Sequence, residues 1–201
     1  MKYSIIVLFT VILAVMPAIP AFAQEGSEKA MPAFVKDFLG QVDFAQSEIL
    51  PLEQAMPAEK AGWRPMEGVR SVSETYLHIA FGNYLMPKLM GYEPPADVNF
   101  SMDLKKWDTQ TTDMAKIADI LKASFDHIGG VAKKMTAKDL EKQIDFFGNT
   151  TTIRNAMMSA LNHMHEHLGQ SIAYARMNSV VPPWTAAEQA AEAAKKEKSG
   201  K

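Results

Sequence analysis

Cysteine is absent from all 201 residues of the chain. The protein can therefore form no disulfide, present no thiolate nucleophile and build no cysteine-type zinc site. Its stability must come from a hydrophobic core instead. The sequence also lacks a glycine-rich phosphate loop, a Gly-x-Ser-x-Gly nucleophile motif and any internal repeat.

The chain also lacks a strong excess of charge of either sign. Lys and Arg number 21 against 23 Asp and Glu, which gives a formal net charge of −2. Domains that bind nucleic acid usually carry a basic surface, so this balance gives no reason to expect DNA or RNA as a partner. A small-molecule substrate is compatible with it, and the composition leaves a homodimer open.

The first 23 residues are predicted to be a secretory signal peptide. Lys2 gives a basic start, an apolar run broken only by Thr10 covers residues 5–15, and Ala21-Phe22-Ala23 fits the cleavage pattern. The run is short for a membrane span, so an uncleaved anchor is the less favoured alternative. Cleavage near Ala23 predicts an exported protein, periplasmic or secreted, with no stable membrane insertion. It would begin with a flexible leader over residues 24–31.

Four segments show apolar residues at three- and four-residue steps, which is the pattern of helices that bury one face. We expect these helices to begin near Pro32, Ser71, Thr112 and Thr151, and the last to end near Met177. No segment has a convincing strand pattern. The prediction is therefore an all-α four-helix bundle over residues 32–184, followed by a short helical tail rich in Ala, Glu and Lys over residues 185–201.

Two pairs of residues have the spacing of a capping box, in which side chains three residues apart satisfy the first backbone N–H groups of a helix. Ser71 and Glu74 form one pair, and Thr185 and Glu188 form the other at the start of the tail.

Other helix ends are predicted from single residues. Pro51 is expected to end the first helix or to kink its last turn. Thr150 or Thr151 is the expected cap of the fourth helix. The connector over residues 136–148 is expected to hold at most one short helix.

Three of the five histidines lie in the stretch LNHMHEHLGQ, as His163, His165 and His167. Alternate spacing would suit a strand, but the surrounding apolar residues have a helical period. Because each helical residue turns by about 100°, His163 and His167 share a face and His165 points the opposite way. Such a pair can bring two imidazoles to one metal. The alternative is two polar histidines, exposed or separately hydrogen-bonded.

A third ligand would have to come from elsewhere, and His78 is the best candidate. It lies in mid-helix among apolar neighbours, where an unsatisfied imidazole would cost about 1–3 kcal/mol. Metal coordination would satisfy it, as would a hydrogen bond to a carbonyl or to Glu74 one turn earlier. His127, expected near a helix C-terminus that suits a partly charged ring, is left out of the site.

Two blocks of the sequence resemble the DinB/YfiT-like superfamily of small helical-bundle metalloproteins. The first is WRPMEGVRSVSETYLHIAFGNY, with its Trp-Arg-Pro loop, Arg-Ser helix start, Glu74 and His78. The second is NHMHEHLGQSIAYARMNSVVPPW, with a His-x-x-x-His-x-Gly-Gln core and a closing Pro-Pro-Trp. The likeness extends over about residues 34–184. It implies that His78, His163 and His167 bind one divalent metal, and it does not select His165.

A site of three imidazoles would suit Zn²⁺ or Ni²⁺ and would leave a coordination position open, as catalytic sites do. Members of the resembled family include thiol-dependent transferases and isomerases. The low-molecular-weight thiols that they use are mainly cytoplasmic, so predicted export argues against copying that chemistry. We expect a metal-dependent hydrolase or transferase, with catalytic residues unknown because no general base stands out. The alternatives are a non-catalytic exported protein that binds a metal or ligand, and an interaction module without metal.

Several neighbours of the histidines have two interpretations each. Glu74 could orient His78 or serve only in its capping box. Gln170 and Tyr174 continue the face of His163 and His167, where they could touch substrate or hydrogen-bond between helices. Arg64 and Arg70 could attract an anionic substrate if their loop overhangs the site.

Overall fold

The computed structural model describes residues 30–199, and the chain is mostly helical there, as predicted. The predicted signal peptide and nearly all of the predicted leader lie outside the described residues. Four long helices surround the core: α1 (Ala33–Ala55), α2 (Val72–Leu89), α4 (Met114–Ala132) and α6 (Ile153–Met177). Shorter elements join them: η1 (Ala58–Lys60), η2 (Ala96–Val98), α3 (Leu104–Asp108), α5 (Ala137–Leu140), β1 (Gln143–Phe146) and β2 (Asn149–Thr152).

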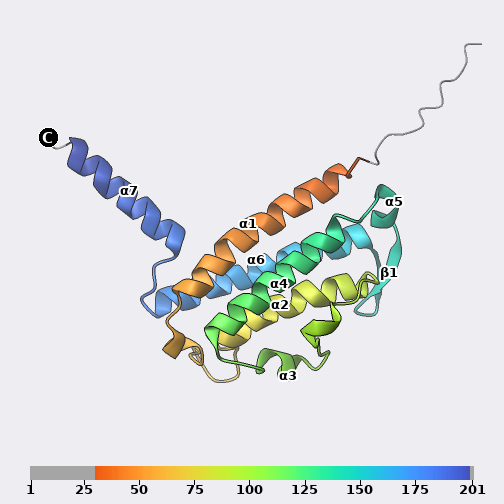
Figure 1. Cartoon of the computed structure of the whole chain (residues 1–201), viewed down its shortest axis with the longest axis horizontal. Helices are drawn as coiled ribbons and strands as arrows, with labels where there is room; N and C mark the ends of the chain where they lie inside the picture. Colours follow the sequence, from red (N-terminus) through yellow and green to blue (C-terminus); the bar gives the residue numbers. More distant parts are fainter. Residues whose placement is uncertain (1–29, 200–201) are drawn as a thin grey trace, which may run out of the picture. The chain divides into compact units, whose positions relative to one another are not determined.

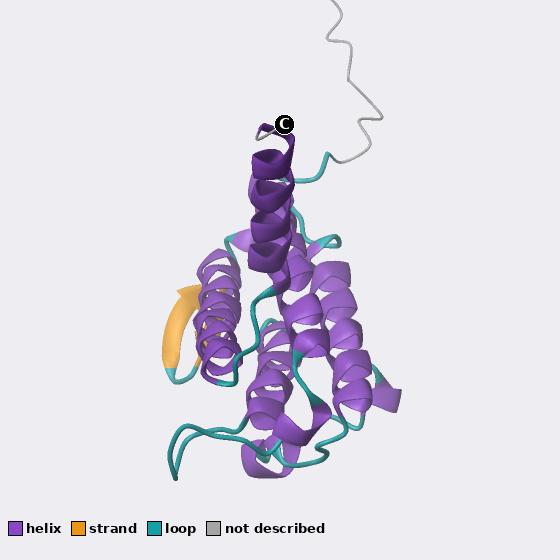
Figure 2. Ribbon diagram, turned by 90° about the vertical axis from the view of Figure 1, so that its left-hand side faces the viewer, coloured by secondary structure: helices purple, strands orange, loops and turns teal. Residues whose placement is uncertain are grey.

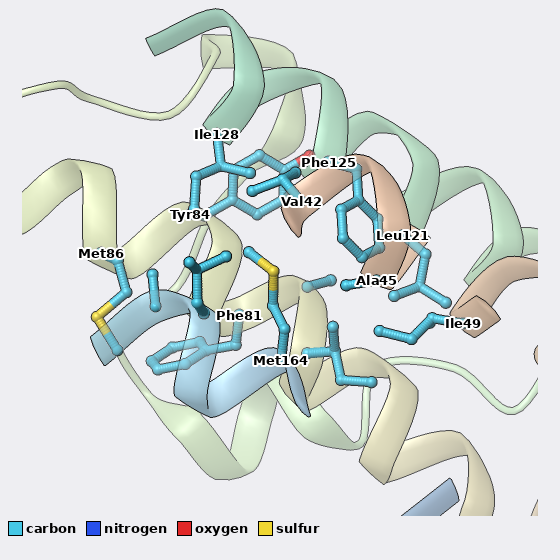
Figure 3. Close-up of a cluster of buried hydrophobic side chains, with 14 of the residues drawn as sticks. Val42, Ala45, Ile49, Phe81, Tyr84, Met86, Leu121, Phe125, Ile128 and Met164 are labelled. Atoms are coloured by element: carbon cyan, nitrogen blue, oxygen red, sulfur yellow. The ribbon is translucent and has the colours of Figure 1, made fainter. Parts of the chain in front are cut away.

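The apolar faces of the long helices meet in one core. Helices α1 and α2 each pack against both α4 and α6, as the ribbon in Figure 1 shows. Figure 3 shows side chains from all four helices interlocking, among them Val42, Ile49, Phe81, Tyr84, Leu121, Phe125 and Met164. This packing holds α2 and α6 side by side, and those two helices carry the candidate ligands.

Some helix ends lie where the capping residues and prolines of the sequence predicted them, and others do not. The capping box at Ser71 is confirmed: Ser71 Oγ accepts from Glu74 N–H at 3.3 Å, and Glu74 Oε2 accepts from Ser71 N–H at 2.8 Å. Of the two alternatives for Pro51, that it ends the first helix is wrong, since α1 continues to Ala55. Pro51 lies within the last turns of the helix, and a kink there stays a prediction. Proline removes one backbone hydrogen bond, and burial of the next residue, Leu52, holds the final turn in place.

The expectation that no strand forms is wrong. Strands β1 and β2 form an antiparallel hairpin in which Phe146 pairs with Asn149. It is drawn in orange at the edge of the helices in Figure 2. Phe147 and Gly148 have φ of 56° and 81°, so both central residues of the two-residue turn are left-handed, as a type I′ turn requires. Phe-Gly is an unusual pair for this turn, and the two strands are only four residues each.

The hairpin also moves the cap of the fourth helix. Thr150 and Thr151 lie in β2, so neither caps the helix as expected. Thr152 takes that role, and its Oγ1 accepts from Asn155 N–H at 3.2 Å. The β-branched threonines suit an extended strand, and the last of the run serves as the cap.

Replacing Gly148 by alanine is expected to destabilise the fold by about 1 kcal/mol, because a Cβ at this left-handed position is disfavoured. Urea denaturation followed by circular dichroism measures the change. Gly40→Ala in α1, where an added Cβ meets no described atom within 4 Å, is the control and should lose no stability. Equal stabilities for Gly148→Ala and the parent would contradict the turn assignment.

The tail forms helix α7 (Pro183–Ser199), which contacts α1 and buries none of its residues. The capping box expected from Thr185 and Glu188 is wrong, because the helix begins two residues before Thr185. Pro183 occupies the first helical position, where its missing N–H costs nothing and its fixed φ suits the helix. Within residues 30–199, none of the helices combines the length and apolarity needed to cross a membrane.

Candidate metal centre

Three histidines converge between α2 and α6. His78 comes from α2, and His163 and His167 come from α6, one turn apart. Their candidate ligand atoms all lie within 4.8 Å of one another. The ring centroids are 5.0 Å apart for His78 and His163, 4.8 Å for His78 and His167, and 4.6 Å for His163 and His167. The predicted grouping of these three side chains is therefore confirmed.

The other two described histidines lie elsewhere. His165 points away from the cluster, donates from Nδ1 to the Leu161 carbonyl at 2.9 Å and stacks on Phe44. His127 packs against Tyr84, and burial lowers its pKa, aided by the charge of Lys134. The expectation of a partly charged His127 is wrong, because α4 continues through both following glycines and leaves this residue inside the helix.

A glycine on α2 makes room for one of the rings. Gly82 lies one turn after His78, and a Cβ built on it would stand 2.4 Å from His163 Cε1 and 2.5 Å from His163 Nδ1. Side-chain atoms do not approach that closely, so the ring of His163 can occupy its position only because residue 82 has no side chain. Gly82 is not among the site residues predicted from the sequence. Its one signal is a glycine in mid-helix, which costs about 1 kcal/mol relative to alanine.

The histidines of α6 favour the neutral state. Burial lowers the pKa of His163 to about 3, and the charges of His167, His78 and Arg70 contribute to the shift. The pKa of His167 is lowered as well, chiefly by burial. Neutral imidazoles keep a lone pair for a metal at neutral pH.

Two ring nitrogens of the cluster are buried without a hydrogen-bond partner among residues 30–199: His78 Nδ1 and His163 Nδ1. A buried polar atom left unsatisfied costs about 1–3 kcal/mol, so their presence in the core calls for a compensating interaction. A metal ion held by the three rings is one that their chemistry fits. The three histidines therefore suit the divalent metal ion that the family resemblance implies.

A chain of hydrogen bonds fixes the third ring. His167 Nδ1 donates to Gln170 Oε1 at 2.8 Å, Gln170 Nε2 donates to Tyr174 Oη at 2.8 Å, and Tyr174 Oη donates to the Arg70 carbonyl at 3.0 Å. Because Nδ1 carries the hydrogen, Nε2 of His167 has the available lone pair. Gln170 and Tyr174 form hydrogen bonds within α6 and to the loop before α2, and not between two helices. Gln170 also lines an open pocket beside the cluster, so its contact with a substrate stays a prediction.

Asp108, at the end of α3, lies beside His78. Its Oδ2 accepts from Arg70 Nε at 2.8 Å, and its Oδ1 lies 3.5 Å from His78 Nδ1 without forming a hydrogen bond. Trp107 anchors this helix by donating from its indole N–H to the Leu77 carbonyl at 2.8 Å. The sequence carries no periodic signal for Asp108, which follows a loop, and this residue is not among the predicted site residues.

Glu74 does not take the orienting role. One of its oxygens completes the capping box at Ser71, and the other accepts from Arg64 Nη2 at 3.0 Å. The capping alternative for Glu74 therefore holds, and the carboxylate nearest the ring of His78 is that of Asp108.

An open pocket of about 900 Å³ lies beside the cluster. His167, Glu166 and Gln170 line it from α6, and Asp108 and Lys105 line it from α3. Arg64 and Arg70 line it from the loop before α2, so that loop does overhang the site. A small molecule in this pocket can therefore reach the cluster at His167.

The family model of the DinB superfamily matches residues 41–171, a span that includes the pocket loop and all three clustered histidines. The chain belongs to the DinB superfamily. No curated protein matches its sequence.

Solved structures of DinB-like proteins share the fold of this superfamily member. One from Bacillus cereus is 20% identical, with a TM-score of 0.62 over 74% of this chain and 95% of that one. One from Bacillus subtilis is 21% identical, with a TM-score of 0.53 over 75% and 94% of the two chains. A conserved protein from Enterococcus faecalis is 16% identical, with a TM-score of 0.61 over 73% and 97%. At these identities the likeness shows the fold alone.

Proposed function

We propose that this DinB-superfamily protein binds one divalent metal ion through His78, His163 and His167 and acts as a metal-dependent hydrolase or transferase on a small molecule. One observation carries the proposal: three imidazoles, two of them with lowered pKa values, lie with ligand atoms within 4.8 Å beside an open pocket. Three nitrogen ligands suit Zn²⁺ or Ni²⁺.

Some residues around the cluster orient the histidine rings, and others line the pocket through which a small molecule reaches them. When bound, the ion would supply a Lewis acid and a water of lowered pKa. Gln170 holds the ring of His167, and Asp108 lies against that of His78. Glu166 lines the pocket, and we propose that its carboxylate accepts a proton from a bound molecule.

Elemental analysis of protein purified without added metal tests the ligand set. The parent and the control variant His165→Ala are expected to carry about one metal per chain, since His165 lies outside the cluster. Alanine variants of His78, His163 and His167 should lose it while keeping their helical circular dichroism. A parent protein that holds no metal, and takes up neither Zn²⁺ nor Ni²⁺ on titration, would contradict the proposal.

A measurement of substrate turnover distinguishes an enzyme from a protein that only binds a metal or ligand. A substrate screen on the metal-loaded parent should find activity that a chelator removes, that added metal restores and that His167→Ala lacks. Stoichiometric metal with no turnover across hydrolase and transferase substrates would favour an exported protein that only binds a metal or ligand.

Export is part of the proposal, with cleavage near Ala23. The basic start and apolar run of the first 23 residues support it. Amino-terminal sequencing of protein recovered outside the cytoplasm should begin at Gln24. Recovery of the full-length chain in the cytoplasm alone would contradict it.

Asp108→Asn is expected to weaken metal binding about 10-fold while the fold persists, because a neutral amide binds Arg70 less strongly than a carboxylate does and removes the negative charge 3.5 Å from His78 Nδ1. Competition with a zinc-sensitive dye measures the affinity. Asp119→Asn, at an exposed position of α4, is the matched control and should bind like the parent. An unchanged affinity for Asp108→Asn would remove Asp108 from the site.

A further inference from the structure

Arg70 is held in place by two hydrogen bonds, and its two terminal nitrogens remain available as hydrogen-bond donors. Its carbonyl accepts from Tyr174 Oη at 3.0 Å, and its Nε donates to Asp108 Oδ2 at 2.8 Å. Its two terminal nitrogens form no hydrogen bond with any described residue, and the side chain is 32% exposed where it lines the pocket. The guanidinium is therefore held in position, and its terminal nitrogens are left to bind a molecule in the pocket.

The Arg70 guanidinium lies close to the histidines. Asp108 stands between the two groups, with one oxygen on Arg70 and the other 3.5 Å from His78. A small molecule in the pocket can touch the Arg70 guanidinium and the ring of His167 together.

The charges that line the pocket nearly cancel before any metal binds. Arg64 pairs with Glu74 at 3.0 Å and Arg70 with Asp108 at 2.8 Å. Lys105 and Glu166 remain, one of each sign, so Glu166 opposes an anion as Lys105 attracts it. With neutral histidines, a divalent ion would make the pocket positive, and a low-dielectric cleft strengthens that field.

This step rests on the proposed metal centre. We infer that the pocket selects substrates that carry an oxyanion, which is either a carboxylate or a phosphate group. The two terminal nitrogens of Arg70 bind the oxyanion side by side, in the forked geometry that arginine offers and lysine does not. Lys105 adds a second positive charge at the rim. The oxyanion then holds the rest of the substrate against the three histidines.

Ligand-detected NMR on the metal-loaded protein tests the inference with three probes of similar size: benzoate, phenyl phosphate and the neutral benzamide. Benzoate or phenyl phosphate should bind the parent at least about tenfold more tightly than benzamide, and the stronger of the two identifies the class of oxyanion. Arg70→Gln should remove that preference, and Arg70→Lys should restore only part of it. Arg176→Gln, at an exposed position of α6 outside this pocket, should leave it unchanged.

Metal content, measured on the same samples, separates the two proposals. A metal-loaded protein whose anion binding ignores Arg70, or that binds benzamide as tightly as benzoate, would overturn the anion preference and leave the metal centre standing. Anion binding that depends on Arg70 in a protein that takes up no metal would support the preference and overturn the metal centre. Circular dichroism of Arg70→Gln should match the parent, since Tyr174 binds the backbone carbonyl of residue 70, which the variant keeps.

Discussion

Gly82→Ala is expected to weaken metal binding by about 100-fold or more while the helical fold survives. An added methyl group would overlap the ring of His163, with contacts of 2.4 Å and 2.5 Å. The ring is the end of a rotatable side chain, so it can swing aside at a smaller energetic cost than a shift of helix α2. Losing the position of one ligand should cost at least as much affinity as losing a group that orients a ligand.

The same dye competition measures this effect, with helical content followed by circular dichroism. Gly169→Ala is the matched control, because it lies on the helix that carries His163 and its added Cβ meets no described atom within 4 Å. That variant should keep the parent affinity and gain up to about 1 kcal/mol of stability from the helix propensity of alanine. Parent-like affinity in Gly82→Ala would show that the ring does not need the space at residue 82.

Glu53→Gln is expected to stabilise the fold at alkaline pH and to have little effect in acid. Glu53 is 1% exposed in α1, and neither carboxylate oxygen has a hydrogen-bond partner among residues 30–199. Burial raises its pKa from 4.5 to about 7. Its charge in turn contributes to the raised pKa of the neighbouring Tyr76 hydroxyl.

The direction of the pH effect follows from the raised pKa of the folded state. Between pH 4.5 and about 7 the folded protein holds a proton on Glu53 that the unfolded chain has released. The stabilisation from the protonated carboxyl is complete below pH 4.5, falls as the pH rises towards 7, and is absent above it. Glutamine does not titrate, so Glu53→Gln should exceed the parent by on the order of 3 kcal/mol at pH 8 and match it near pH 4.

Urea denaturation of the metal-free protein at pH 4, 6 and 8 measures this difference without a contribution from metal binding. Glu59→Gln, at an exposed position of η1, is the control and should follow the parent at every pH. A stability difference between Glu53→Gln and the parent that is the same at pH 4 and pH 8 would show that the carboxyl does not titrate as burial predicts.

The sequence predicted the helices and the pairing of His163 with His167 because both depend on periodicity. Apolar spacing placed the long helices to within a few residues, and a helical turn of about 100° separated His165 from His163 and His167. The convergence of His78 with that pair is a tertiary contact, which spacing along one helix cannot supply. The family resemblance supplied that expectation, and the packing of α2 against α6 bears it out.

The features that the sequence did not predict depend on contacts between distant segments or on single turns. Asp108 reaches His78 because Trp107 anchors α3 on α2, a contact across 30 positions of the chain. Gly82 matters because of a ring on another helix. The hairpin depends on the left-handed backbone of Phe147 and Gly148, and its four-residue strands are too short for a clear alternation of apolar residues.

Anomalous diffraction from crystals soaked in Zn²⁺ tests the metal centre most directly. A single strong peak should appear about 2 Å from one ring nitrogen of each of His78, His163 and His167, the usual length of a zinc–imidazole bond. A peak at His165 or His127 in its place, or no peak between α2 and α6 at saturating Zn²⁺, would contradict it.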